Sequence, residues 1–164
     1  MNQKIGVIGV GNMAKAIISG IVSSDLSVSE ILLFDQNPTQ YQDLPTSELL
    51  RPMMSISETV KAADCVLISV KPQNYNEVLK EIATVDHHEE KLYISIGAGI
   101  SSQSVSEQLN GACVIRVLPN VPILIGMGLS VICKNQSASK ERFDFVCSVF
   151  WQADLSGCPC VYSD

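Results

Sequence analysis

The first structural unit of the chain reads Lys4-Ile5-Gly6-Val7-Ile8-Gly9-Val10-Gly11-Asn12-Met13-Ala14-Lys15-Ala16-Ile17, an apolar strand followed by a glycine turn and an apolar helix. The spacing Gly9-x-Gly11-x-x-Ala14 is the Gly/Gly/Ala form of the dinucleotide-binding fingerprint. Gly9 permits the tight turn, Gly11 lets the backbone approach a pyrophosphate, and Ala14 lets the helix pack close to the strand. The phosphates would lie at the positive N-terminal end of the helix. The motif predicts a dinucleotide site; a structural turn without a ligand is the alternative.

The composition fits one α/β domain. Aliphatic residues are plentiful and aromatic residues make up 5% of the 164 residues, which suits a Val/Ile/Leu sheet core. The formal net charge of −6 argues against a nucleic-acid or anionic-membrane surface. The longest uncharged stretch, 117–133, is broken by prolines and glycines, which excludes a membrane-spanning helix there. No signal-peptide pattern follows the N-terminus, so we expect a cytoplasmic protein.

The cysteines and histidines give no metal or redox signature. Four of the six cysteines lie in apolar strand or helix patterns and are expected to be small buried hydrophobes: Cys65, Cys113, Cys133 and Cys147. Cys158-Pro159-Cys160 has no second cysteine or histidine pair at ligand spacing, which disfavours a metal site. His87-His88 lies among acidic residues and is expected to belong to a solvated loop.

Strand-like and helix-like segments alternate along the chain. The expected strands cover 5–9, 31–34, 53–56, 65–70, 92–96, 112–117 and 129–133. The expected helices cover 12–21, 57–63, 75–83, 101–109 and 140–150, with Asn12 and Ser57 as N-caps of the first two. This alternation predicts a Rossmann-like α/β fold: a doubly wound, mostly parallel sheet with helices on both faces. After Trp151 we expect only turns.

Four strand ends carry unusual sequences: Gly9-Val10-Gly11, Val70-Lys71-Pro72-Gln73, Gly97-Ala98-Gly99 and Leu118-Pro119-Asn120-Val121-Pro122. Ligands of open α/β sheets bind beyond the carboxyl ends of the strands, so these segments are expected to converge on one crevice. The small residues at 97–99 would leave room for a flat ring or a ribose. Lys71 would supply a cation and Asn120 an amide. Taken alone, each segment could equally be a structural loop.

Asp35 follows the second expected strand directly. At this position a carboxylate accepts a hydrogen bond from the ribose 2′-hydroxyl of NAD and repels the 2′-phosphate of NADP. The next arginine along the chain is Arg51, too distant in sequence to favour NADP. Asp35-Gln36-Asn37-Pro38 is also ordinary turn chemistry. The residues themselves favour NAD, and a purely structural Asp35 stays open.

These motifs resemble those of the pyrroline-5-carboxylate reductase family, the last enzyme of proline biosynthesis. The segment 5–14 is similar to the family's N-terminus, and 70–73, 95–101 and 116–122 are similar to its next three motifs, in order and at similar spacing. The resemblance covers essentially the whole chain. It implies hydride transfer from NADPH or NADH to the ring imine of 1-pyrroline-5-carboxylate, giving L-proline. The family more often uses NADP, so both cofactors are carried forward.

By position, the resemblance implies that Gly9, Gly11, Asn12 and Met13 hold the pyrophosphate. It implies that the nicotinamide half is lined by Val70, Lys71, Pro72, Gly97, Ala98 and Asn120. With Val10 and Asp35 added, these are the predicted cofactor-binding residues. No catalytic residue and no metal ligand is predicted.

Two features depart from the family pattern. Val121 stands where the family usually has threonine, which removes a hydroxyl near the reacting end. The family's helical second domain, with its Ser-Gly-x-Gly-Pro-type loop for the substrate carboxylate, has no match in the chain. We therefore expect residues 1–164 to be the NAD(P)-binding domain, with the helical dimerisation and substrate domain absent.

Three hypotheses follow from these features. The chain is a reductase whose second domain is lost or supplied in trans, a non-catalytic dinucleotide-binding module, or a remnant that binds nothing. A small molecule is the expected partner, rather than a nucleic acid or a membrane. A homo-oligomer and a partner that supplies the missing domain both stay open.

Overall fold

The computed structural model describes residues 3–119, 130–154 and 160–163, with side chains as far as residue 151. Within them, eight strands form one sheet in the order β3-β2-β1-β4-β5-β6-β7-β8. The strands are β1 (Gln3–Ile8), β2 (Val28–Phe34), β3 (Leu50–Pro52), β4 (Cys65–Ile68), β5 (Leu92–Ser95), β6 (Cys113–Leu118), β7 (Val131–Lys134) and β8 (Cys160–Ser163). Neighbours from β3 to β6 pair in parallel, β7 runs antiparallel to β6, and β8 is parallel to β7. The predicted doubly wound, mostly parallel sheet is confirmed.

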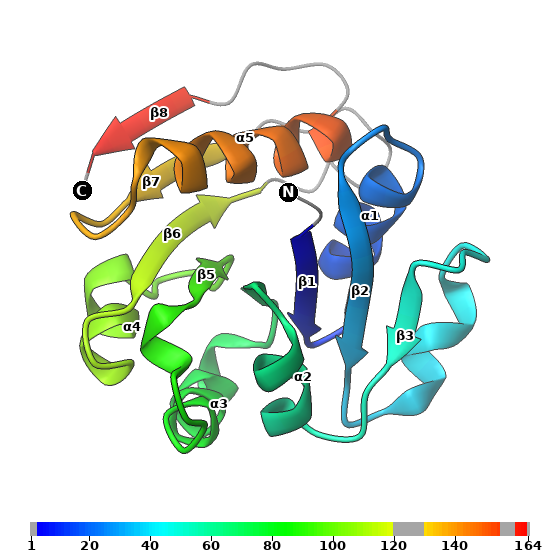
Figure 1. Cartoon of the computed structure of the whole chain (residues 1–164), viewed down its shortest axis with the longest axis horizontal. Helices are drawn as coiled ribbons and strands as arrows, with labels where there is room; N and C mark the ends of the chain where they lie inside the picture. Colours follow the sequence, from blue (N-terminus) through cyan, green and yellow to red (C-terminus); the bar gives the residue numbers. More distant parts are fainter. Residues whose placement is uncertain (1–2, 120–129, 155–159, 164) are drawn as a thin grey trace.

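Helices cover both faces of this sheet (Figure 1). On one face, α1 (Asn12–Val22) and α5 (Lys140–Asp154) pack against each other and against the sheet. The other face carries α2 (Ile56–Ala62), α3 (Tyr75–Ile82) and α4 (Ser102–Gln108). Three short 3₁₀ turns complete the described elements: η1 (Pro38–Asp43), η2 (Pro72–Asn74) and η3 (His88–Glu90).

The two hydrophobic cores explain the uniformly apolar strands. Alternate side chains of β4 point to opposite faces, so that Cys65 and Leu67 join the α1/α5 core whereas Val66 and Ile68 join the core under α2, α3 and α4. A central parallel strand with helices on both sides must be apolar at every position. The same reasoning accounts for Ile31-Leu32-Leu33 in β2, all three of which are buried.

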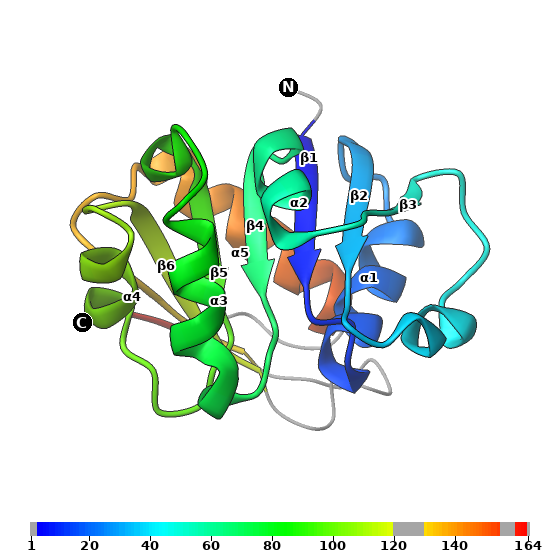
Figure 2. The same cartoon turned by 90° about the horizontal axis from the view of Figure 1, so that it is seen from below.

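The direction in which the sheet is wound changes next to β1. β2 and β3 lie on one side of β1, and β4, β5 and β6 lie on the other. Viewed from the side of α2 and α3, the arrowheads of β1, β2 and β4 point to the same edge (Figure 2). A ligand crevice of such a sheet forms where the strand order reverses. The fold therefore points to the carboxyl ends of β1, β2 and β4.

Both predicted N-caps were wrong. The helix α1 begins at Asn12, and its N-cap is Gly11. The helix α2 is capped by Ser55, whose hydroxyl accepts a hydrogen bond from the Glu58 N–H at 3.0 Å. The Glu58 carboxylate in turn accepts from the Met54 N–H at 2.8 Å. This reciprocal pattern, a serine three residues before a glutamate, resembles a capping box and explains why Ser55 starts the helix.

Two expectations for strands were also wrong. The edge strand β3 covers Leu50–Pro52 rather than 53–56, and an edge position tolerates its terminal proline. Beyond Trp151 the chain forms more than turns, because α5 continues to Asp154 and β8 pairs with β7. Val161 and Tyr162 in β8 have the high strand propensity that the turn interpretation overlooked.

The histidine and cysteine expectations had mixed outcomes. His87 is exposed, but His88 is buried: its Nδ1 lies 2.7 Å from the Val85 carbonyl oxygen, so the solvated-loop interpretation is wrong for His88. Cys65, Cys113 and Cys133 are buried as predicted, and Cys147 is half-buried. Burial raises the pKa of Cys65 and of Cys113. Cys158 and Pro159 lie outside the described residues.

No helix within the described ranges has the length and apolar character needed to cross a membrane.

Candidate functional site

A cavity of about 430 Å³ opens at the carboxyl ends of β1, β2 and β4. Five predicted cofactor-binding residues line it: Gly9, Gly11, Asp35, Val70 and Lys71. The remaining lining comes from the strand ends and the helices beside them: Ile8, Phe34, Gln36, Gln40, Ile56, Ser69, Asn74, Glu77, Val78 and Glu81. The cavity therefore coincides with the reversal of strand order, where a ligand of this fold is expected.

The two glycines of the turn differ in what the protein itself requires of them. Gly9 has φ +88°, and a Cβ added there would lie 2.7 Å from the Ser69 carbonyl oxygen. The fold alone thus demands glycine at 9. Gly11 has φ −77°, which any residue adopts, and an added Cβ would meet nothing within 4 Å. Packing gives no reason for glycine at 11, but close approach of a ligand would give one.

The N-terminus of α1 opens on the same space. Its N-cap, Gly11, has no side chain to cap the helix, and its first turn carries no acidic residue. The N–H groups and the positive end of the dipole of this 11-residue helix are thus available to an anion. Asn12 and Met13 are its first two residues. Their predicted contact with a pyrophosphate runs through backbone N–H groups, so it does not depend on their side chains lining the cavity.

Asp35 links the glycine turn to the end of β2. Its Oδ2 accepts a hydrogen bond from the Val10 N–H at 2.7 Å, and its Oδ1 accepts from the Asn37 N–H at 2.8 Å. The Asp35 N–H donates to the Tyr41 hydroxyl at 2.8 Å. Burial raises the pKa of Tyr41, so its hydroxyl stays protonated near neutrality. The turn interpretation of Asp35 is therefore correct for Oδ1, while Oδ2 reaches the predicted dinucleotide turn.

The charges around the cavity are mostly negative. Asp35 stands at the end of β2, and Glu77 and Glu81 project from one face of α3 at i and i+4 spacing. Lys71 is the one cation among the described lining residues. Sequence analysis missed Glu77 and Glu81, because glutamates at i and i+4 on an amphipathic helix look like an ordinary solvated face.

Gly97 has a structural explanation of its own. A Cβ there would lie 2.6 Å from the Cε2 and Cζ atoms of Tyr75. Tyr75 is buried; its hydroxyl donates to the Ile68 carbonyl at 2.9 Å and lies 3.1 Å from the Ser95 hydroxyl. Burial raises the pKa of Tyr75. Tyr75 thus joins the ends of β4 and β5, and Gly97 makes room for its ring.

The remaining predicted residues do not line the cavity, or lie outside the described residues. Pro72 begins η2 and is exposed. Val10, the middle residue of the Gly9–Gly11 turn, is buried. Gly97 and Ala98 follow β5, two strands away from β1 in the sheet, with Gly97 buried and Ala98 exposed. Asn120 and Val121 lie outside the described residues.

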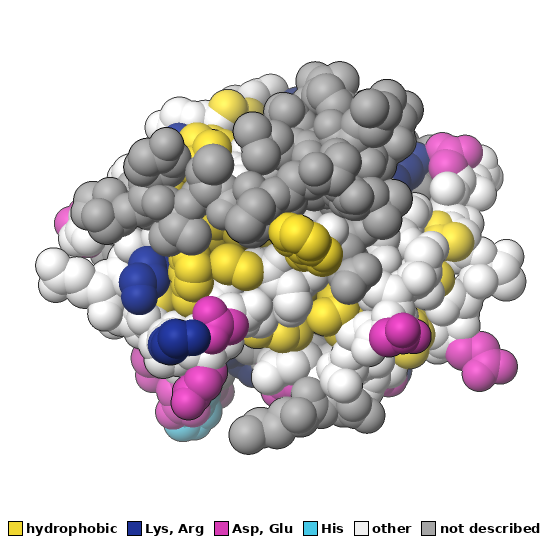
Figure 3. Space-filling view, turned by 90° about the horizontal axis from the view of Figure 1, so that it is seen from above, with side chains coloured by type: hydrophobic (Ala, Val, Ile, Leu, Met, Phe, Trp, Pro, Cys, Tyr) yellow, Lys and Arg dark blue, Asp and Glu magenta, His cyan; other side chains and the backbone are white. Residues whose placement is uncertain are grey.

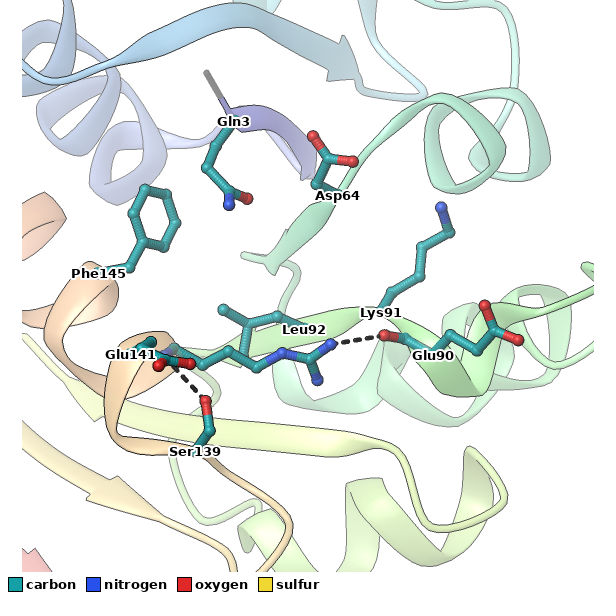
Figure 4. Close-up of a pocket in the computed structure, with 9 residues that line it drawn as sticks. Gln3, Asp64, Glu90, Lys91, Leu92, Ser139, Glu141 and Phe145 are labelled. Carbon is teal, nitrogen blue, oxygen red and sulfur yellow. Dashed lines mark hydrogen bonds between the residues drawn. The ribbon is translucent and has the colours of Figure 1, made fainter. Parts of the chain in front are cut away.

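A second cavity, of about 690 Å³, lies at the opposite edge of the sheet, near the starts of β1, β4 and β5 (Figure 4). Three of its five charged side chains are hydrogen-bonded to backbone groups. The Arg142 guanidinium donates to the Glu90 carbonyl at 2.8 Å, the Lys91 ammonium donates to the Ala63 carbonyl at 2.6 Å, and Asp64 accepts from the Lys4 N–H at 2.9 Å. These contacts hold the loops and α5 against the sheet, so the three charged side chains have a structural role.

One surface group has metal-ligand chemistry among the described residues. His87, Glu89 and Glu90 place ligand atoms within 4.8 Å of one another, and all three are exposed. Exposed groups of this kind are common without an ion, so no metal site is assigned.

Residues 4–99 match the family described as NADP oxidoreductase, coenzyme F420-dependent. The chain belongs to this family. The match covers the first five strands and the whole described cavity. It therefore includes both cavity glycines, Asp35 and Lys71.

Comparison with individual proteins shows which members of the family the chain is similar to. The chain is 32% identical over 145 residues to a pyrroline-5-carboxylate reductase of Corynebacterium melassecola, covering 87% of the chain and 54% of the relative. Among solved structures, a pyrroline-5-carboxylate reductase from Coxiella burnetii has a TM-score of 0.86 at 20% identity, covering 100% of the chain and 59% of that protein. The Plasmodium falciparum pyrroline carboxylate reductase, solved with NADP bound, has a TM-score of 0.79 at 24% identity, covering 99% and 58%. The resemblance predicted from the motifs is confirmed, and the chain spans a little over half the length of these relatives.

Proposed function

We propose that the chain is the dinucleotide-binding part of a pyrroline-5-carboxylate reductase. In this proposal, NADH or NADPH reduces the ring imine of 1-pyrroline-5-carboxylate to L-proline. The observation that carries the proposal is the empty space above Gly11 at the uncapped start of α1. The fold does not need a glycine there, whereas a pyrophosphate lying on the helix N-terminus does.

The residues fit the two halves of such a cofactor. The backbone N–H groups of Gly11, Asn12 and Met13 would hold the pyrophosphate. Val70, Lys71 and Pro72 would line the nicotinamide half, together with Gly97, Ala98 and Asn120. Lys71 would also place its ammonium near a phosphate or a ribose.

The proposed reaction needs little acid–base catalysis from these residues. When bound, a dihydronicotinamide supplies the hydride. A protonated imine is already electrophilic, so the chain needs mainly to orient the two rings and to exclude water. The contacts of Tyr75 with the ends of β4 and β5 serve that purpose, because its hydroxyl bonds to the Ile68 backbone carbonyl and to the Ser95 side-chain hydroxyl.

The charges of the cavity favour NADH over NADPH in this proposal. NADPH differs by a 2′-phosphate on the adenosine ribose, which would meet the negative charges of Asp35, Glu77 and Glu81 at this cavity. Two unit charges 4 Å apart interact by about 1 kcal/mol in bulk water and by about 4 kcal/mol at an effective dielectric constant of about 20. We expect NADH to bind at least about 10-fold more tightly.

The proposal also includes a second domain, an assembly and a cellular location. Residues 1–164 would form the dinucleotide domain, and a helical domain outside these residues would supply the loop for the substrate carboxylate. That domain would belong to the same polypeptide or to a partner, and the assembly would be a homo-oligomer. A cytoplasmic location fits an enzyme that draws on soluble nicotinamide cofactors.

A paired titration tests the proposal. Binding of NADH and of NADPH is followed by the cofactors' own fluorescence, with Gly11→Ala as the non-binding control. Saturable binding to the unaltered chain and loss of binding in Gly11→Ala are expected. A folded chain that binds neither cofactor would refute the proposal.

Turnover separates the enzyme from a binding module. Oxidation of NADH is measured with 1-pyrroline-5-carboxylate, first with this chain and then with the chain plus the C-terminal half of a relative. Turnover in either mixture supports the reductase. Cofactor binding without turnover in both would favour a non-catalytic dinucleotide-binding module.

A further inference from the structure

The hydrogen bond between Asp35 and the glycine turn carries a consequence beyond cofactor choice. In β1 and β2 the backbone ladder ends with the Gly9 N–H donating to the Phe34 carbonyl at 2.8 Å. The next donor, the Val10 N–H, finds no strand carbonyl and donates to the Asp35 carboxylate at 2.7 Å. The Asp35 side chain thus extends the ladder by one bond into the turn.

We propose that Asp35 is a positioning residue that holds the Gly9–Gly11 turn in its ligand-ready form through the Val10 N–H. Val10 is fully buried, so its N–H would lose its partner without the carboxylate, and an unpaired buried donor is costly. The bond is charge-assisted, which makes it stronger than a neutral one. The second oxygen of Asp35 is fixed by the Asn37 N–H, and the Asp35 backbone by Tyr41.

Each carboxylate oxygen carries one hydrogen bond and retains a second acceptor position. A ribose hydroxyl can therefore bind Asp35 while the bond to Val10 persists. In consequence, Asp35 would act on two parts of the adenosine diphosphate. Its carboxylate would bind the ribose hydroxyl, and its bond to Val10 would hold the turn that binds the pyrophosphate. The ribose contact in this inference rests on the proposed function, whereas the positioning of the turn through Val10 does not.

Two substitutions separate these roles. Asp35→Asn removes the charge but keeps one acceptor oxygen. We expect that oxygen to remain on Val10, because the Asn37 N–H is exposed and water can replace its partner. Asp35→Ala removes both the charge and the acceptor. Asp43→Asn is the matched control, since Asp43 pairs with Lys15 on the surface at 2.8 Å and does not line the cavity.

Amide hydrogen exchange of the cofactor-free chain tests the turn directly. In Asp35→Ala, we expect the Val10 amide to exchange about 10-fold faster or more, because it loses a bond to a charged group. The Gly9 amide, bonded to Phe34, serves as the internal reference and should change far less. In Asp35→Asn the Val10 amide should exchange more slowly than in Asp35→Ala, because a neutral bond remains, and in Asp43→Asn both amides should stay near their original rates. Equal acceleration of Gly9 and Val10 in Asp35→Ala, or no change at Val10, would overturn the proposal.

Cofactor titration of the same variants tests the consequence for binding. Both substitutions remove the charge that disfavours NADPH, so the two variants are compared with each other for each cofactor. Asp35→Ala should bind each cofactor several-fold more weakly than Asp35→Asn, and it should lose about 10-fold in NADH affinity relative to the unaltered chain. Equal affinities of the Asn and Ala variants for each cofactor would contradict the positioning role. If the unaltered chain binds neither cofactor, the proposed function fails, while the exchange experiment still decides the role of Asp35 in the turn.

Discussion

At the scale of single residues, Gly9, Gly11 and Gly97 differ in why glycine stands at each position. Gly9 is required by a positive φ and by the contact with Ser69, and Gly97 is required by the Tyr75 ring. Gly11 is required by neither. A sequence motif cannot distinguish these causes, since it records only that a side chain is absent. The added-Cβ distances do, and they give no packing reason for glycine at position 11.

The first prediction follows from this contrast. Gly11→Ala should change stability by less than about 1 kcal/mol, because the gain from restricting the unfolded chain at a compatible φ is offset by the poorer N-cap preference of alanine. The same substitution should weaken cofactor binding at least about 10-fold, because the methyl group occupies the pyrophosphate space. Gly9→Ala should destabilise the fold by about 1–3 kcal/mol. Urea unfolding and cofactor titration measure both effects; equal destabilisation by the two variants would contradict the assignment.

The second prediction concerns Gly97 and Tyr75. Gly97→Ala should destabilise the fold by about 1–3 kcal/mol, because the buried ring of Tyr75 must move. Tyr75→Leu vacates that space, so Gly97→Ala should cost much less in the Tyr75→Leu background. A double-mutant cycle by urea unfolding measures this coupling. Additive effects of the two substitutions would show that the close contact does not govern the choice of glycine at 97.

At the scale of elements, the buried strands and most helices could be predicted from the sequence, because a continuous apolar run or a 3.6-residue period is a strong local signal. The exact residues at which several helices and strands begin and end could not be predicted. Ser55 and Ser57 are both acceptable caps by residue type, and only the reciprocal contacts with Glu58 choose between them. The strand β8 was missed because its pairing with β7 lies across the intervening helix α5.

The third prediction tests the cap of α2. Ser55→Ala should destabilise the chain by about 1 kcal/mol, because the Glu58 N–H loses its acceptor. Ser57→Ala is the matched control and should change stability by less than about 0.5 kcal/mol, since it lies past the cap and makes no capping bond in the described structure. The two free energies of unfolding are compared in urea. A larger effect at Ser57 would refute the cap assignment.

At the scale of the whole molecule, the candidate site could be predicted only in part. The glycine turn, Asp35, Val70 and Lys71 meet in one cavity, since the carboxyl ends of parallel strands share an edge. Glu77 and Glu81 escaped because exposed glutamates on an amphipathic helix look like any solvated face. The face shown in Figure 3 has hydrophobic side chains at its surface. Among the described residues, Trp151 of α5 is 52% exposed.

The fourth prediction concerns the stability of the whole chain. A cofactor that binds only the folded state at 100 times its Kd adds about 2.7 kcal/mol of stability. For a chain of this size, that corresponds to a rise in Tm of about 5–10 °C. Differential scanning fluorimetry with NADH should show this rise, and Gly11→Ala should show almost none. An equal rise in both proteins would place the cofactor away from the glycine turn.

The reversal between β6 and β7 decides at which edge of the sheet α5 begins. Leu118 and Val131 face each other in the ladder, so the chain leaves and re-enters the sheet at neighbouring positions on the edge that holds the glycine turn. The strand β7 therefore runs back toward the opposite edge of the sheet, and α5 begins there, where Arg142 donates to the Glu90 carbonyl at 2.8 Å. The antiparallel step thus makes α5 start from the edge opposite to the one where α1 starts beside the Gly9–Gly11 cavity.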